Sequence, residues 1–193
     1  MKKSFVFLYP INEKFDVAVE SYSYGKETPK KFRKRCKEYI NEIIDLRYRK
    51  KGFQVNYAVY SDTRVSDMID LKGGDTILNV GLTLNKHKIK VNGEHLYPVD
   101  NASILEKLNP DILRIGGFFM WDCVEKLAKR AHERRIDVLV DEDLTEFMFN
   151  RVFDKKLDRK KYNPKYILKD KIFTKEKFLE VRRERPWLFN DYK

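Results

Sequence analysis

The sequence has little cysteine, no long apolar run and no internal repeat. Its two cysteines, each expected on a different helix, exclude a scaffold held together by disulfides. No stretch approaches the roughly 20 apolar residues that a membrane span requires, so we expect no membrane contact. The apolar start of the chain stops at Pro10 without a small-residue cleavage site, unlike a secretion signal. These features predict a cytoplasmic protein.

The chain has ample apolar material for a core, and its charge is unevenly distributed. Of its 193 residues 42% are hydrophobic, which excludes disorder along the whole chain. The net charge of +11 comes from the two ends of the chain. Residues 1–52 contain 14 Lys and Arg against 7 Asp and Glu, residues 53–145 contain 12 against 15, and residues 146–193 contain 15 against 8. Basic ends on one face would attract a polyanion such as nucleic acid; the alternative is that these lysines are only solvated. The composition leaves the oligomeric state open.

Short apolar strands alternate with amphipathic helices along most of the chain. The expected strands cover 4–11, 53–62, 75–82, 111–119 and 136–144, and the expected helices cover 29–51, 100–109 and 122–135. Residues 12–28 are mixed, and within them 21–28 indicate a loop or edge hairpin; Asn92–Gly93 indicates a tight hairpin turn. The alternation predicts a doubly wound, Rossmann-like three-layer α/β domain with a mainly parallel sheet over residues 1–145. A basic, aromatic C-terminal extension, 146–193, is expected to pack on it. The strand residues expected to be buried are Val6, Leu8, Val55, Ile77, Leu113, Val138 and Val140.

Ligands of such sheets bind beyond the carboxyl ends of the strands. We therefore expect an unidentified small molecule to contact the residues that follow the strands. These are Asn12, Asp62, Asn79, Gly117, Phe118 and Trp121.

Residues 116–143 carry the strongest chemical signal. A purely structural interpretation accounts for most of them, with Asp122 and Glu125 capping a helix in the manner of a capping box. The functional interpretation concerns Cys123, because a thiol in the first turn of a helix lies at the positive end of the dipole. That position favours the thiolate and makes Cys123 a candidate nucleophile.

The same stretch resembles the isochorismatase-like cysteine hydrolases over about residues 4–145. In that family a strand ends in glycine, and the nucleophilic cysteine follows six residues later. A valine comes directly after the cysteine, and alanines follow five and eight residues past it. An aspartate ends the next strand. The matching residues are Gly117, Cys123, Val124, Ala128, Ala131 and Asp143. The resemblance implies an α/β hydrolase that acts on a small molecule through Cys123, without a cofactor.

Two family positions differ. The first strand should end in an acidic proton acceptor, but here it ends in Tyr9 to Asn12. The lysine expected after the third strand is replaced by Asn79 or Val80. A thiol without its base and its cation lacks activation, so the resemblance implies a degenerate member whose catalytic site is altered or lost.

Two alternatives remain. Asp122, Asp141 and Asp143 have the separation of the later aspartates in PIN-like metal nucleases, which predicts a Mg²⁺ or Mn²⁺ site for nuclease or phosphoesterase chemistry. The second alternative is a non-catalytic scaffold whose basic ends bind a nucleic acid or an acidic partner. Its lysine-rich tail offers aromatic side chains that could stack on bases or anchor the tail: Tyr162, Tyr166, Phe173 and Phe178.

Overall fold

The computed structural model describes residues 1–163, 180 and 184–189, and it contains a five-stranded parallel sheet. The strand order is β3-β2-β1-β6-β7. The strands are β1 (Lys3–Leu8), β2 (Gln54–Val59), β3 (Thr76–Asn79), β6 (Ile112–Gly117) and β7 (Asp137–Thr145). The predicted doubly wound, mainly parallel fold is therefore confirmed.

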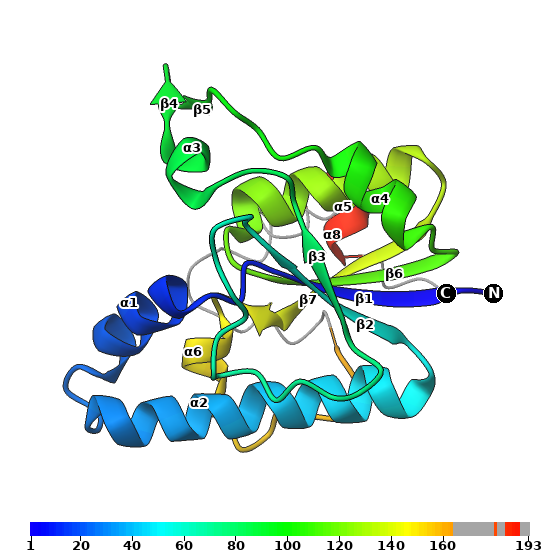
Figure 1. Ribbon diagram of the computed structural model, residues 1–193. Coiled ribbons are helices and arrows are strands. Elements are labelled where there is room, and N and C mark those ends of the chain that lie inside the picture. Colours follow the sequence, from blue (N-terminus) through cyan, green and yellow to red (C-terminus); the bar gives the residue numbers. More distant parts are fainter. Residues whose placement is uncertain (164–179, 181–183, 190–193) are drawn as a thin grey trace.

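Helices cover both faces of the sheet (Figure 1). One face carries α1 (Asn12–Ser23), α2 (Pro29–Ile43) and α6 (Met148–Arg151), and the other carries α4 (Asn101–Leu108), α5 (Glu125–Glu133) and α8 (Pro186–Phe189). The central strand β1 is apolar on both sides, because Phe5 and Phe7 belong to the first core and Val6 and Leu8 to the second. This double burial explains why its sequence is a continuous apolar run. Within the described residues, no helix is both long and apolar enough to cross a membrane.

The long helix α2 begins and ends at the residues that the sequence indicates. The Thr28 hydroxyl accepts a hydrogen bond from the backbone N–H of Lys31, and Pro29 occupies the first helical position. The helix continues through a π-helical turn and a 3₁₀ turn to Gly52, whose φ of 74° ends it in the left-handed region.

Helix α1 was not predicted: it covers residues 12–20, to which the sequence assigned no element, and the first three residues of the loop expected over 21–28. Phe15, Val19 and Ser23 form its buried stripe at helical spacing. One prediction of burial is wrong. Ile77 is 53% exposed instead of buried, because β3 is the edge strand and only β2 pairs with it. The other six strand residues expected in the core are buried.

A small arm, defined here as residues 84–97, projects from the body of the molecule (Figure 1). It consists of α3 (Leu84–Lys88) and an antiparallel hairpin of β4 (Lys90–Val91) and β5 (Glu94–His95). Asn92 and Gly93 both have positive φ values, of 51° and 84°, as the predicted tight turn requires. The arm matters because its two histidines face the start of the helix that carries Cys123.

Candidate metal centre

Cys123 lies in a π-helical turn, Met120–Val124, that follows β6 and continues into α5. The thiol side chain is only 6% exposed. The turn depends on Gly117, whose φ is 121° and whose missing Cβ would collide with the backbone of Leu8. The close approach of β1 and β6 at this glycine places Cys123 beyond the carboxyl ends of the central strands.

The predicted helix cap is wrong, because Asp122 does not cap this helix. The Glu146 carboxylate instead accepts hydrogen bonds from the backbone N–H groups of Phe119 and Met120. Asp122 has turned to other partners: its carboxylate lies 2.7 Å from Lys126 Nζ and 3.0 Å from His95 Nε2. The acid next to Cys123 is therefore free of the helix end and belongs to the side-chain cluster around the thiol.

His87, from α3, contacts the thiol directly. Its Nε2 lies 3.4 Å from Cys123 Sγ, and its Nδ1 lies 3.3 Å from the backbone oxygen of Tyr97. A carbonyl oxygen can only accept a hydrogen bond, so Nδ1 carries the proton. The Nε2 lone pair is consequently directed at the sulfur.

His95, from β5, is held in the same way. Its Nδ1 donates to the backbone oxygen of His87 at 2.5 Å, and its Nε2 faces the Asp122 carboxylate. The two imidazole rings are stacked, with centroids 4.0 Å apart. With the proton on Nδ1, an imidazole lone pair and a carboxylate face each other at 3.0 Å, and this arrangement requires a cation, either a proton or a metal ion.

Together these side chains make a compact donor set. One ring nitrogen of His87, one of His95 and the sulfur of Cys123 all lie within 4.8 Å of one another. Donation of the second imidazole N–H to a backbone carbonyl is the usual support of a metal-binding histidine. Nitrogen and sulfur donors suit zinc and related transition metals, whereas Mg²⁺ and Mn²⁺ prefer oxygen. The residues present therefore fit a zinc-type ion.

The surroundings keep the Cys123 thiol and the His87 imidazole neutral in the absence of a cation. Burial and the neighbouring charge of Asp122 raise the pKa of the Cys123 thiol to about 11. Burial also lowers the pKa of His87. A neutral thiol beside a neutral imidazole is a poor nucleophile, but a bound metal ion would stabilise the thiolate and displace its proton.

Most of the other residues predicted to contact a ligand serve the loops or the core. The side-chain oxygens of three of them accept hydrogen bonds: Asn12 from the Ser66 hydroxyl at 2.5 Å, Asp62 from the Leu84 N–H at 2.9 Å, and Asn79 from the Gly81 N–H at 2.7 Å. Phe118 is buried against other rings of the α1–α2 face. Trp121 is 45% exposed.

The three predicted metal-binding acids do not form one group in the described part of the chain. Asp141 accepts from Arg47 at 2.8 Å and from the Tyr48 hydroxyl at 2.5 Å. Asp143 pairs with Arg47 at 2.8 Å and with Arg151 at 2.9 Å. Asp141 and Asp143 are thus paired with buried arginines, while Asp122 belongs to the histidine cluster, so the structure does not bring the three acids together.

The aromatic tail is only partly described. Tyr162 donates to the Glu142 carboxylate at 2.9 Å, and the Arg47 guanidinium lies 5.8 Å from its ring centroid. These contacts anchor Tyr162 to the domain rather than leave it free to stack on a base. Tyr166, Phe173 and Phe178 lie outside the described residues.

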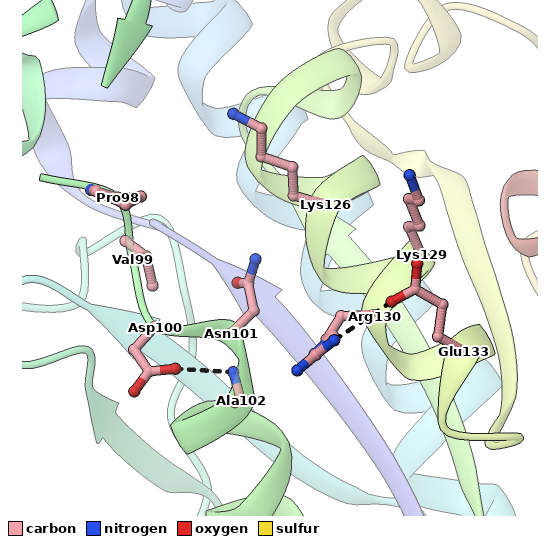
Figure 2. A pocket seen from close by; sticks show the side chains of 9 residues that line it. All are labelled: Pro98, Val99, Asp100, Asn101, Ala102, Lys126, Lys129, Arg130 and Glu133. Atoms are coloured by element: carbon pink, nitrogen blue, oxygen red, sulfur yellow. Dashed lines mark hydrogen bonds and ion pairs between the residues drawn. The ribbon is translucent and has the colours of Figure 1, made fainter. Parts of the chain in front are cut away.

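An open groove of about 560 Å³ lies between the start of α4 and α5 (Figure 2). Three cations from α5 line it, Lys126, Lys129 and Arg130, and Arg130 pairs with Glu133. Cys123 does not line this groove. The groove is connected to the histidine cluster through Lys126, which lines the groove and also pairs with Asp122.

Neither a protein-family profile nor a curated protein sequence matches the chain. Solved structures do. N-carbamoylsarcosine amidase from Thermoplasma acidophilum matches at 21% identity, covering 75% of this chain and 84% of that one, with a TM-score of 0.46. A zinc complex of pyrazinamidase from Pyrococcus horikoshii matches at 14% identity over 96% of both chains, with a TM-score of 0.46.

An isochorismatase from Pseudomonas putida matches at 14% identity, covering 74% of this chain and 70% of that one, with a TM-score of 0.46. The chemistry of this protein therefore has to be argued from its own residues.

Neither His87 nor His95 was predicted from the sequence as a site residue. The available signal was their position on either side of the Asn92–Gly93 turn, which brings the two flanking segments together. Glu146 was also missed, because its contact with the helix start joins residues 27 positions apart.

Proposed function

We propose that this protein is a zinc-type metalloprotein on an isochorismatase-like fold, with the ion held by His87, His95 and Cys123. One observation carries the proposal. His87 and His95 each have Nδ1 against a backbone carbonyl, so the Nε2 of His87 faces the buried thiol and the Nε2 of His95 faces the Asp122 carboxylate. Lone pairs and a carboxylate that face one another repel when no cation lies between them, and a bound cation stabilises the same arrangement.

The separations suit the ion. Zinc–nitrogen and zinc–sulfur distances of about 2.0–2.3 Å place neighbouring ligand atoms roughly 3–4 Å apart. Here one pair is already 3.4 Å apart, and all three atoms lie within 4.8 Å. Small side-chain rotations would therefore close the set.

Three protein ligands leave one tetrahedral position open, as in catalytic rather than structural zinc sites. Lys126 holds one oxygen of Asp122, and the other oxygen lies 3.0 Å from His95 Nε2, where it adds negative charge beside the ion. The chemistry that such an ion supplies when bound is the polarisation of an oxygen ligand, which suits hydrolysis of a small acyl compound.

The test is a Co²⁺ titration followed by absorption spectroscopy, since Co²⁺ replaces zinc and a cobalt–thiolate bond gives a charge-transfer band. We expect one equivalent to bind to the wild-type protein with that band. His87→Ala and His95→Ala should weaken binding at least tenfold, and Cys123→Ser should remove the band. Cys36→Ser is the matched control, because Cys36 is a buried thiol in the opposite core. Full binding by all three ligand variants would refute the proposal.

A second candidate function rests on the same 3.4 Å contact. His87 and Cys123 have the arrangement of a cysteine–histidine pair whose histidine is oriented by the Tyr97 carbonyl, as in thiol hydrolases. This candidate requires His87 but not His95. Alkylation of Cys123 near neutral pH separates the two: zinc should protect the thiol in the wild type and fail to protect it in His95→Ala. Equal zinc-independent alkylation in both proteins would favour the thiol hydrolase.

A further inference from the structure

The hairpin of the arm has two different faces. Lys90 pairs with His95, and the backbone N–H of Leu96 donates to the backbone oxygen of Ile89. Because side chains alternate along a strand, Ile89, Val91 and Leu96 share one face, opposite the face that carries His95. His95 contacts the body of the molecule, so this apolar hairpin face is directed away from the body. Its three side chains are 46%, 52% and 51% exposed.

Lysines accompany the apolar hairpin face. Adjacent exposed apolar side chains with a polar rim are typical of interaction sites. The single acid of the arm, Glu94, pairs with Lys126 at 3.5 Å. The lysines of the arm are exposed and form no ion pair among the described residues: Lys86, Lys88 and Lys90. A surface that covers this face should therefore combine apolar side chains with free carboxylates.

Helix α1 presents a face of that composition. Glu13, Val17 and Glu20 are exposed and lie on one side of the helix, at four- and three-residue spacing, and Tyr24 follows four residues later. Val17 is 66% exposed and Tyr24 is 90% exposed. In the described part of the chain neither glutamate forms an ion pair. The exposed face of α1 therefore complements the arm both in charge and in apolar character.

The two complementary faces lie at the same edge of the sheet. Helix α1 follows the carboxyl end of β1, the arm follows that of β3, and these strands are parallel. Figure 1 shows α1 and the arm projecting beyond that edge. Between the described residues of one chain, no ion pair joins the arm to α1. A second copy related by a twofold axis would place its α1 on the arm and its arm on α1.

We propose that this protein forms a twofold dimer in which the apolar hairpin face of each copy packs against α1 of its partner. The inference does not depend on the proposed metal function. The contact would bury the aliphatic side chains of the hairpin against the partner's Val17, and the lysines of the arm would face the glutamates of α1. Each dimer would contain this contact twice, because a twofold interface is self-complementary.

Sedimentation velocity over a wide range of protein concentration tests the proposal, and we expect a reversible dimer. Val91→Glu places a carboxylate opposite the glutamates of α1, and Val17→Lys places an ammonium opposite the lysines of the arm. Each change should raise the dissociation constant roughly tenfold or more. An equimolar mixture of the two variants should dimerise again, because one contact is then wild type and the other pairs a glutamate with a lysine.

Ile77→Glu is the matched control, because Ile77 is another exposed aliphatic side chain but lies on the edge strand β3. It should dimerise like the wild type, and an unchanged melting temperature shows that each variant is folded. A wild type that stays monomeric at every concentration would overturn the proposal, and its binding to phosphatidylserine vesicles would assign the arm to a membrane surface instead. A dimer that neither Val91→Glu nor Val17→Lys weakens would also overturn it, as would a mixture of the two that stays monomeric. Equal weakening by Ile77→Glu would place the interface at β3.

Discussion

Cys123 is a thiol whose chemistry depends on a cation. Burial and Asp122 raise its pKa to about 11, so at neutral pH the metal-free protein carries a protonated sulfur next to an imidazole that is also neutral. The histidine protons are fixed by backbone carbonyls and stay in place when a metal binds. Metal binding should therefore exchange one proton, from the thiol.

This proton sets the pH dependence of the site. Because the thiol is protonated below about pH 11, zinc binding between pH 7 and 9 should release one proton. The apparent affinity should rise about tenfold per pH unit over that range. Calorimetry in buffers of different ionisation enthalpy measures the released proton. No proton release would show that the sulfur is not a ligand, and Cys123→Ser supplies the control for buffer effects.

At the level of elements, the helix that starts at Met120 is stabilised from outside its own sequence. Glu146 lies beyond the end of β7 and accepts from two of the first N–H groups of that helix. Capping patterns in the sequence indicated Asp122, because a cap is usually found within the helix that it serves. The strands and longer helices could be predicted because the spacing of their apolar residues and their capping residues can be seen within each segment of the sequence. Helix α1 could not be predicted, because its buried stripe contains few large apolar residues.

The two acids should differ in their effect on stability. Glu146→Gln weakens two hydrogen bonds to the helix start and should lower the free energy of unfolding by roughly 1–2 kcal/mol. Asp122→Asn leaves those bonds intact and should cost the metal-free protein less than about 0.5 kcal/mol, as expected for a partly exposed pair. Urea unfolding of both variants with zinc removed gives the comparison. A larger loss in Asp122→Asn would restore Asp122 as the cap.

The arm is the element that the metal should control. Its histidines, from α3 and β5, meet Cys123 on the body, and the His87–Cys123 contact joins residues 36 positions apart. No local pattern encodes such a meeting, which is why the sequence predicted the hairpin but not the site. A bound zinc ion would hold the arm against the body through bonds to the two histidines of the arm and to Cys123 at the helix start.

Hydrogen exchange should detect this attachment. Removal of zinc by a chelator should speed amide exchange in residues 84–97 and leave β1 and β6 unchanged, because the central strands do not depend on the ion. Cys123→Ser with zinc present should resemble the chelated wild type in the arm. Unchanged exchange in the arm on chelation would show that its position does not depend on a metal.

For the molecule as a whole, the buried arginines account for the role of Asp141 and Asp143, which the sequence left open. Arg47 joins Asp141 and Asp143 and also donates to the backbone oxygen of Asp158, so it connects the π-helical turn after α2 with β7 and with the segment that follows β7. The division of the chain at residue 145 and the attraction of the basic ends for a polyanion stay predictions.

Removal of Arg47 should be costly. Arg47→Met leaves two buried carboxylates without their shared partner and should lower the free energy of unfolding by roughly 3–5 kcal/mol. Lys51→Met removes an exposed cation near the same helix end and should cost little. Neither change should alter Co²⁺ binding, because the arginine network and the histidine cluster share no residue. Loss of Co²⁺ binding in a folded Arg47→Met protein would contradict this separation.

X-ray absorption at the zinc edge of the zinc-loaded protein reports the atoms bound to the ion and shows whether His87, His95 and Cys123 hold it. We expect one sulfur at about 2.3 Å and nitrogen or oxygen neighbours at about 2.0–2.1 Å, with imidazole scattering from two histidines. A spectrum without sulfur, or without imidazole, would contradict it.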